Sequence, residues 1–224
     1  MFFNKILISI FLLQFFLTPQ SSANEFKINA NEHNVRELIR GWTKLIIEKT
    51  GITPQVSFSP DLTFQAGTKY TSSEISFYFT QGVMNKSDDE ALLIACHEIG
   101  HILGKVYKNP RPGNLKLTAT EGEADFFAGM CLRKYFERFP KEPLNYYNIC
   151  NNSKTCNLIL QSALEMFNSD PFNLNFSEET LKLNLPPSPT GKTLQIYPTN
   201  ECRFHSIYAG FLQKPRPNCW FLQP

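Results

Sequence analysis

The chain has 224 residues, and its 22 Lys and Arg against 20 Asp and Glu give a formal charge of +2 at pH 7. A balance this close to neutral gives no electrostatic case for nucleic-acid binding. The length suits a short leader followed by one domain with a single hydrophobic core.

The N-terminus has the order of a secretory signal peptide. A weakly basic start (Met1 to Lys5) precedes an apolar run (Ile6 to Leu17), and Ser21-Ser22-Ala23 supplies small residues for cleavage. The apolar run is short for a membrane span, although an uncleaved anchor is the alternative. We therefore expect a signal peptide over residues 1–23, and a secreted or periplasmic domain over 24–224 with no transmembrane span.

Six cysteines lie in the predicted mature part: Cys96, Cys131, Cys150, Cys156, Cys202 and Cys219. An even number after a signal peptide predicts disulfides, including a cysteine-containing C-terminal region. Cys150 with Cys156 and Cys202 with Cys219 are plausible local pairs. Cys96 is either bonded or a buried free thiol.

The first predicted elements are a helix and two strands. Apolar residues recur at helical spacing from Val35 to Ile46, and Gly51 is a typical stop. Val56 and Phe58 alternate with polar residues in a short strand, and Glu74 to Thr80 is a second, aromatic strand.

The remaining predicted elements are helices. Ser87-Asp88-Asp89-Glu90 is a capping box that opens a helix running to about Gly104, and residues 118–121 can cap the next, which continues to about Phe139. Further helices are expected over 153–167 and 200–212. The sequence thus predicts an α+β fold, mostly helical, with a small sheet beside the helix that begins at Ser87.

That helix carries the pattern HExxH, His97-Glu98-Ile99-Gly100-His101. Residues four apart share a helix face, so both imidazoles can reach one metal ion. Glu98 is rotated off that face and can meet a metal-bound water as a general base. The pattern predicts one Zn²⁺ per chain.

A catalytic zinc site needs a third protein ligand. Glu121 and Asp125 share a face of the following helix, so one can bind metal while the other supports a ligand histidine. Glu123 is the rival ligand, or else a solvated surface carboxylate. Position 107 is Tyr, which removes the three-histidine pattern HExxHxxGxxH. His33 and His205 are outside candidates.

Residues Glu121 to Ala128 (EGEADFFA) resemble the ExxxD helix of the gluzincin metallopeptidases. The chain is most similar to the HtpX-like and CAAX prenyl-protease-like group and its soluble periplasmic relatives. This resemblance implies a zincin-like fold, with Glu121 as the third zinc ligand and Asp125 as the support of a ligand histidine.

The same group carries a His-Pro pair followed by an Arg late in the chain. Here Tyr197-Pro198 and Arg203 stand at that spacing, with Tyr in place of His. The Tyr197 hydroxyl either donates to an oxyanion in the transition state or belongs to a loop with no catalytic part. Arg203 supports the site or simply pairs with a carboxylate.

Together these patterns predict a secreted zinc metalloendopeptidase acting on protein or peptide substrates. The strand at Glu74 to Thr80 is either the sheet edge that binds an extended peptide or a purely structural strand. Two other functions stay open: a non-catalytic secreted binding or envelope-assembly factor that keeps the zinc-bound fold, and a toxin or predatory hydrolase.

Overall fold

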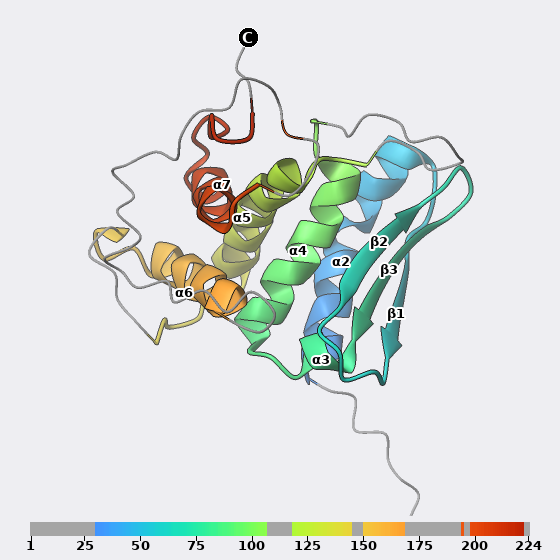
Figure 1. Cartoon of the computed structure of the whole chain (residues 1–224). Coiled ribbons are helices and arrows are strands. Elements are labelled where there is room, and N and C mark those ends of the chain that lie inside the picture. Colours follow the sequence, from blue (N-terminus) through green and yellow to red (C-terminus); the bar gives the residue numbers. More distant parts are fainter. Residues whose placement is uncertain (1–29, 107–117, 145–149, 169–193, 195–197, 222–224) are drawn as a thin grey trace, which may run out of the picture.

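The computed structural model describes residues 30–106, 118–144, 150–168, 194 and 198–221 (Figure 1). The predicted signal peptide lies outside the described residues. The elements in chain order are α2 (Ala30–Thr50), β1 (Gln55–Ser59), β2 (Ala66–Tyr70), β3 (Ile75–Thr80), α3 (Gln81–Met84), α4 (Asp88–Leu103), α5 (Glu121–Arg138), α6 (Lys154–Asn168) and α7 (Asn200–Leu212). The predicted α+β class is therefore confirmed.

The three strands form one mixed sheet in the order β1-β3-β2. β1 pairs with β3 in parallel, and β2 pairs with β3 in the antiparallel sense. The strand predicted over Glu74 to Thr80 is therefore central, and the idea that it offers the sheet edge is wrong. Its two edges are both occupied, because β1 pairs along one and β2 along the other. Ile75, Phe77 and Phe79, which alternate along the strand, are fully buried on one face.

Neither β2 nor the four-residue helix α3 was predicted from the sequence. Ala66–Tyr70 contains one glycine, one lysine and no β-branched residue except Thr68, so its own strand preference is weak. Pairing with β3 makes it a strand, and Gly67 leaves room for the Tyr78 ring that lies across it. β2 is thus an edge strand, and it is the strand next to α4.

Helix α4 is the centre of the molecule. Figure 1 shows α2 and α4 between the sheet on one side and α5, α6 and α7 on the other. Every residue from Asp89 to Ile102 is buried. The predicted start of this helix at Ser87 is confirmed, because the Ser87 side chain caps it by accepting a hydrogen bond from the Glu90 backbone N–H.

Helices α4 and α5 approach each other closely beside the HExxH sequence. A side chain at Gly100 would place its Cβ 2.8 Å from the Cα of Ala124, so only glycine fits there without moving a helix. The two helices are also joined by the disulfide Cys96–Cys131. The segment that carries both histidines is therefore fixed against the start of α5.

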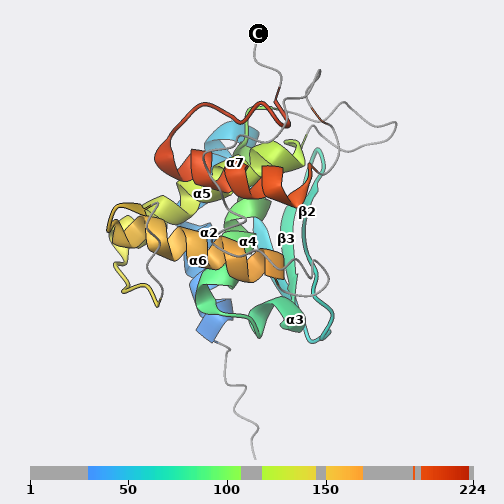
Figure 2. The ribbon, with the colours of Figure 1, turned by 60° about the vertical axis from the view of Figure 1, so that its left-hand side comes forward.

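All six cysteines are bonded. The two predicted local pairs, Cys150–Cys156 and Cys202–Cys219, are confirmed, and the free-thiol alternative for Cys96 is wrong. Figure 2 shows α7 lying across α5, with α6 alongside. Within the described part of the chain, no helix is long and apolar enough to cross a membrane.

Candidate metal centre

His97, His101 and Glu121 meet in the interior between α4 and α5. One ligand atom from each lies within 4.8 Å of the others, and all three residues are buried. The two histidines come from successive turns of α4, as their spacing predicts, and Glu121 is the first residue of α5. The Thr120 side chain caps α5 by accepting a hydrogen bond from the Glu123 N–H, which fixes where that helix begins.

The hydrogen bonds at the far side of each ring determine which nitrogen faces the carboxylate. His101 Nδ1 lies 3.0 Å from the carbonyl oxygen of Ala119, which can only accept, so this nitrogen carries a proton. His97 Nδ1 lies 2.8 Å from Asp125 Oδ1 and likewise donates. Both Nε2 atoms therefore point to Glu121.

The spacing around Glu121 fits a small cation. Its Oε2 lies 3.4 Å from His97 Nε2 and 3.5 Å from His101 Nε2. Two atoms bound to one tetrahedral zinc at about 2.0–2.1 Å are about 3.3–3.4 Å apart. An imidazole that is protonated at Nδ1 alone presents a lone pair at Nε2 to a metal ion. In that state two lone pairs and a carboxylate converge here, and a cation between them stabilises the group. The three residues can thus hold a metal ion.

Asp125 supports this group from behind. It is fully buried and accepts from His97 Nδ1 through Oδ1, while Arg203 donates to it twice, from Nε to Oδ2 at 2.8 Å and from Nη2 to Oδ1 at 3.0 Å. Arg203 comes from α7 and is itself buried. The arrangement Arg203–Asp125–His97 fixes the orientation of the His97 ring.

Neighbouring charges shift the pKa values of His97, Glu121 and Asp125. Burial alone would lower the pKa of His97, but the carboxylates of Asp125 and Glu121 outweigh it and raise that pKa to about 10. Burial would raise the pKa of Glu121, but the two imidazoles hold it well below its usual range. The pKa of Asp125 is also lowered, because Arg203 and His97 outweigh its burial. The group therefore strongly favours a positive charge, whether proton or metal, beside Glu121.

Glu98 directly follows His97 on α4 and is not one of the three residues that can hold the metal. Thr68 of β2 lies with its hydroxyl 2.7 Å from Glu98 Oε2 and 3.0 Å from the Glu98 backbone oxygen. The edge strand of the sheet is thereby attached to this carboxylate. Nothing in the sequence pattern pointed to Thr68, because β2 itself was not predicted.

Glu123 is neither the rival ligand nor a solvated surface carboxylate. Its side chain is buried and receives two N–H groups of Arg216 and the backbone N–H of Lys105. Two residues along a helix correspond to a rotation of about 200°, so Glu123 faces away from Glu121 and from the histidines. Arg216 lies 93 residues further on.

The other predicted candidates lie elsewhere. His33 is exposed on α2 and His205 is half-buried on α7; in the described ranges, neither belongs to the group that can hold a metal. Burial lowers the pKa of His205, partly offset by Glu201. Tyr197 lies outside the described residues, so its catalytic role stays a prediction.

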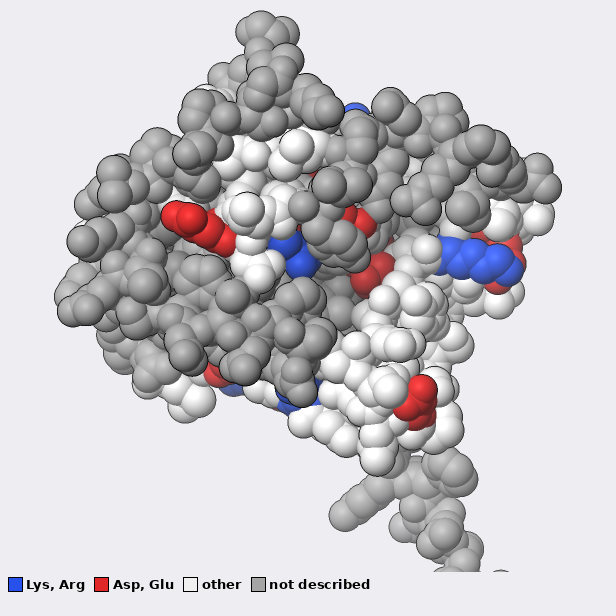
Figure 3. Space-filling view, viewed as in Figure 1, with Lys and Arg blue, Asp and Glu red and all other residues white. Residues whose placement is uncertain are grey.

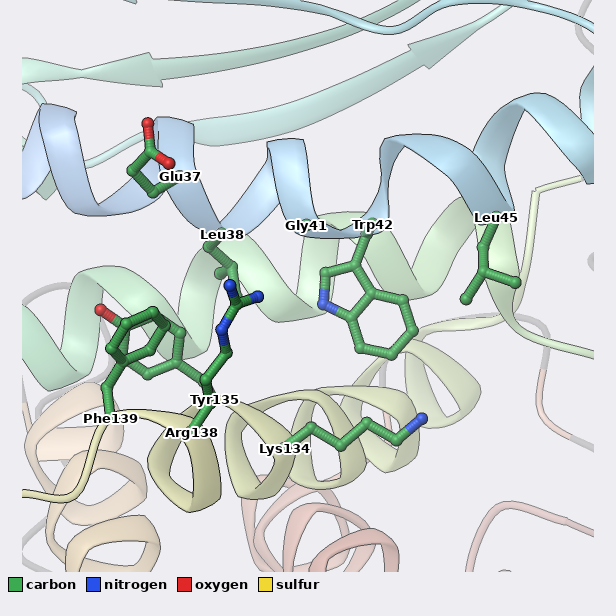
Figure 4. A pocket seen from close by; sticks show the side chains of 9 residues that line it. All are labelled: Glu37, Leu38, Gly41, Trp42, Leu45, Lys134, Tyr135, Arg138 and Phe139. Carbon is green, nitrogen blue, oxygen red and sulfur yellow. The ribbon is translucent and has the colours of Figure 1, made fainter.

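A hollow among the described residues lies away from the metal group. It lies between α2 and α5, has a volume of about 270 Å³, and is lined by Trp42, Leu45, Tyr135 and other residues that take no part in the metal group (Figure 4). On the face drawn in Figure 3, the described residues show acidic side chains recessed near the centre and no extended patch of one charge.

Comparisons of the chain with protein-family models, curated proteins and solved structures found no match.

Proposed function

We propose that this chain is a secreted or periplasmic zinc-dependent peptidase with a zincin-like fold. The observation that carries the proposal is the convergence of His97, His101 and Glu121 on one point, with Glu98 beside them on the same helix. The sequence resemblance to the gluzincins, and three disulfides suited to an oxidising compartment, support it.

Two imidazoles and one carboxylate form a ligand set that catalytic zinc sites use, with the fourth position open to water. When bound, the zinc would acidify a water molecule to a pKa near 7 and polarise the scissile carbonyl. Other first-row metals bind such sets too, so metal analysis has to identify the ion.

The chain's own residues would then move the proton. Glu98 accepts a proton from the attacking water and delivers it to the leaving amine. Its Oε2 is engaged by Thr68, which leaves Oε1 as the basic atom. Asp125 keeps the His97 ring in one orientation, and Arg203 balances the buried charge of Asp125.

The substrate we propose is an extended peptide lying along β2. This strand pairs with β3 on one side only, and Thr68 places it beside Glu98. Peptide binding along a strand edge uses backbone hydrogen bonds, which suits a peptidase with broad sequence tolerance.

Purified mature protein should contain about one zinc per chain by elemental analysis and should cleave an unfolded protein such as casein. A strong zinc chelator should stop the cleavage. Glu98→Gln should keep the zinc and lose the activity, whereas Glu48→Gln, on the exposed face of α2, should keep both. Zinc binding without cleavage in the wild type would favour a binding or assembly factor instead, and full activity of Glu98→Gln would refute the assigned role.

A further inference from the structure

The segment that follows α7, residues 214–221, returns to the first turn of α5; we call it the C-terminal clasp. Its backbone begins against α7, where the Lys214 N–H donates to the Ala209 carbonyl. The disulfide Cys202–Cys219 bonds it to the start of α7. The clasp is therefore attached to α7 near both of its ends, at Lys214 and at Cys219.

Its first contact with α5 is ionic. Arg216 donates from Nη2 to Glu123 Oε1 at 2.7 Å and from Nε to Oε2, in a two-pronged pair. Glu123 is only 1% exposed, and its Oε1 also accepts from the Lys105 backbone N–H, just beyond the end of α4. One carboxylate thus joins the clasp, the first turn of α5 and the end of the HExxH helix.

Its second contact with α5 is steric. Trp220 is fully buried against Gly122, the residue directly after the ligand Glu121. A Cβ at Gly122 would lie 2.3 Å from the Trp220 ring, so the indole packs directly on the backbone of the ligand turn. Phe126, Cys202, Ala209 and Cys219 complete this small cluster, which is separate from the main core.

We propose that the C-terminal clasp positions Glu121 as a metal ligand, and that the Cys202–Cys219 bond makes metal affinity depend on the oxidation state of the chain. The inference rests on the metal centre proposed above. Glu121 lies between Thr120, which caps α5, and the two residues that the clasp contacts, Gly122 and Glu123. Its carboxylate can stay in reach of both histidines only while that turn is held.

Reduction releases the clasp. A dithiol reductant gives two electrons and two protons to the Cys202–Cys219 bond, which becomes two thiols while the reductant forms its own disulfide. The clasp is then linked covalently to the fold through the backbone from α7, so the Arg216–Glu123 pair and the packing of Trp220 on Gly122 have to hold it against α5 without the disulfide. The chain would retain metal best after reaching an oxidising compartment and poorly in a reducing cytosol.

The test is zinc affinity, measured by competition with a chromophoric chelator on the full mature chain. Cys202→Ala/Cys219→Ala and Arg216→Met should each weaken zinc binding at least tenfold. Arg216→Lys should fall between Arg216→Met and wild type, because lysine keeps the charge without the two-pronged geometry. The matched control is Cys150→Ala/Cys156→Ala, which removes a bond at the start of α6 and should stay within threefold of wild type.

Three results would overturn the proposal. One is wild-type affinity in Arg216→Met, which keeps all three disulfides and remains informative even where the double cysteine variant fails to fold. Another is an equal loss in the Cys150/Cys156 control, which would trace the effect to general destabilisation. A wild type that binds no zinc removes the metal centre and the clasp together, whereas zinc-binding wild type and unaffected variants remove the clasp alone.

Discussion

Asp125→Ala should lower both the stability of the fold and the affinity for zinc, and the two losses can be measured separately. Asp125 accepts from His97 Nδ1 at 2.8 Å and from two nitrogens of Arg203, and it has no exposed surface. Removing the carboxylate leaves the His97 N–H without its acceptor. It also takes from Arg203, which is buried, the carboxylate that accepts two of its N–H groups.

The two losses have different sizes and different observables. Breaking a buried ion pair by deleting one partner costs about 3–5 kcal/mol of folding free energy. Loss of the hydrogen bond behind a ligand histidine weakens metal binding by about 10–100-fold. Urea unfolding of the metal-free protein measures the first, and chelator competition at a temperature well below unfolding measures the second.

The double variant Asp125→Ala/Arg203→Met distinguishes these effects. With both charges gone, no unpaired buried ion remains, so most of the lost stability should return. The zinc affinity should stay low, because His97 still lacks its acceptor. The reasoning is refuted if the double variant regains wild-type zinc affinity, or if folded Asp125→Ala binds zinc within about threefold of wild type.

Three further predictions follow from other contacts. Thr68→Val should lower kcat by up to about 100-fold at unchanged zinc content, because the hydroxyl holds the Glu98 carboxylate in place and a misplaced base reacts poorly. Thr68→Ser should keep most activity, and equal losses in both variants would argue against the hydroxyl. With a metal-free pKa of about 10, His97 carries a proton at pH 7 that zinc must displace, so zinc affinity should rise with pH, and calorimetry in two buffers should detect the released proton. Cys96→Ala/Cys131→Ala should lower the free energy of unfolding by about 2–4 kcal/mol in urea titrations, and an unchanged midpoint would contradict this.

Local patterns were enough to predict most of the helices. Apolar spacing predicted α2, and the side chains of Ser87 and Thr120 marked where α4 and α5 begin. The strand β2 was missed because its residues have little intrinsic preference for a strand, and pairing with β3 decides its structure. The same omission concealed Thr68, the residue that contacts Glu98.

The sequence likewise predicts some residues of the metal group and leaves others to the packing of the helices. The four-residue spacing of His97 and His101 is set by one helix, so the sequence alone predicts that they converge. Glu121 joins them only because Gly100 lets α5 approach α4, which is a property of two packed helices. The role of Arg203 was left open because its partner, Asp125, lies 78 residues away.

Glu121 and Glu123 show why a helix start rich in acid does not by itself specify a ligand. Both carboxylates benefit from the positive end of α5, and both are buried, so each needs a cation close by. The helix turns them to opposite sides: Glu121 toward the histidines and Glu123 toward Arg216. A guanidinium cannot lose its charge, so the pair at Glu123 is permanent, whereas the positive charge beside Glu121 can be a proton or a metal ion. The permanent pair at Glu123 belongs to the fold, whereas the exchangeable position beside Glu121 is the one that can take a metal ion.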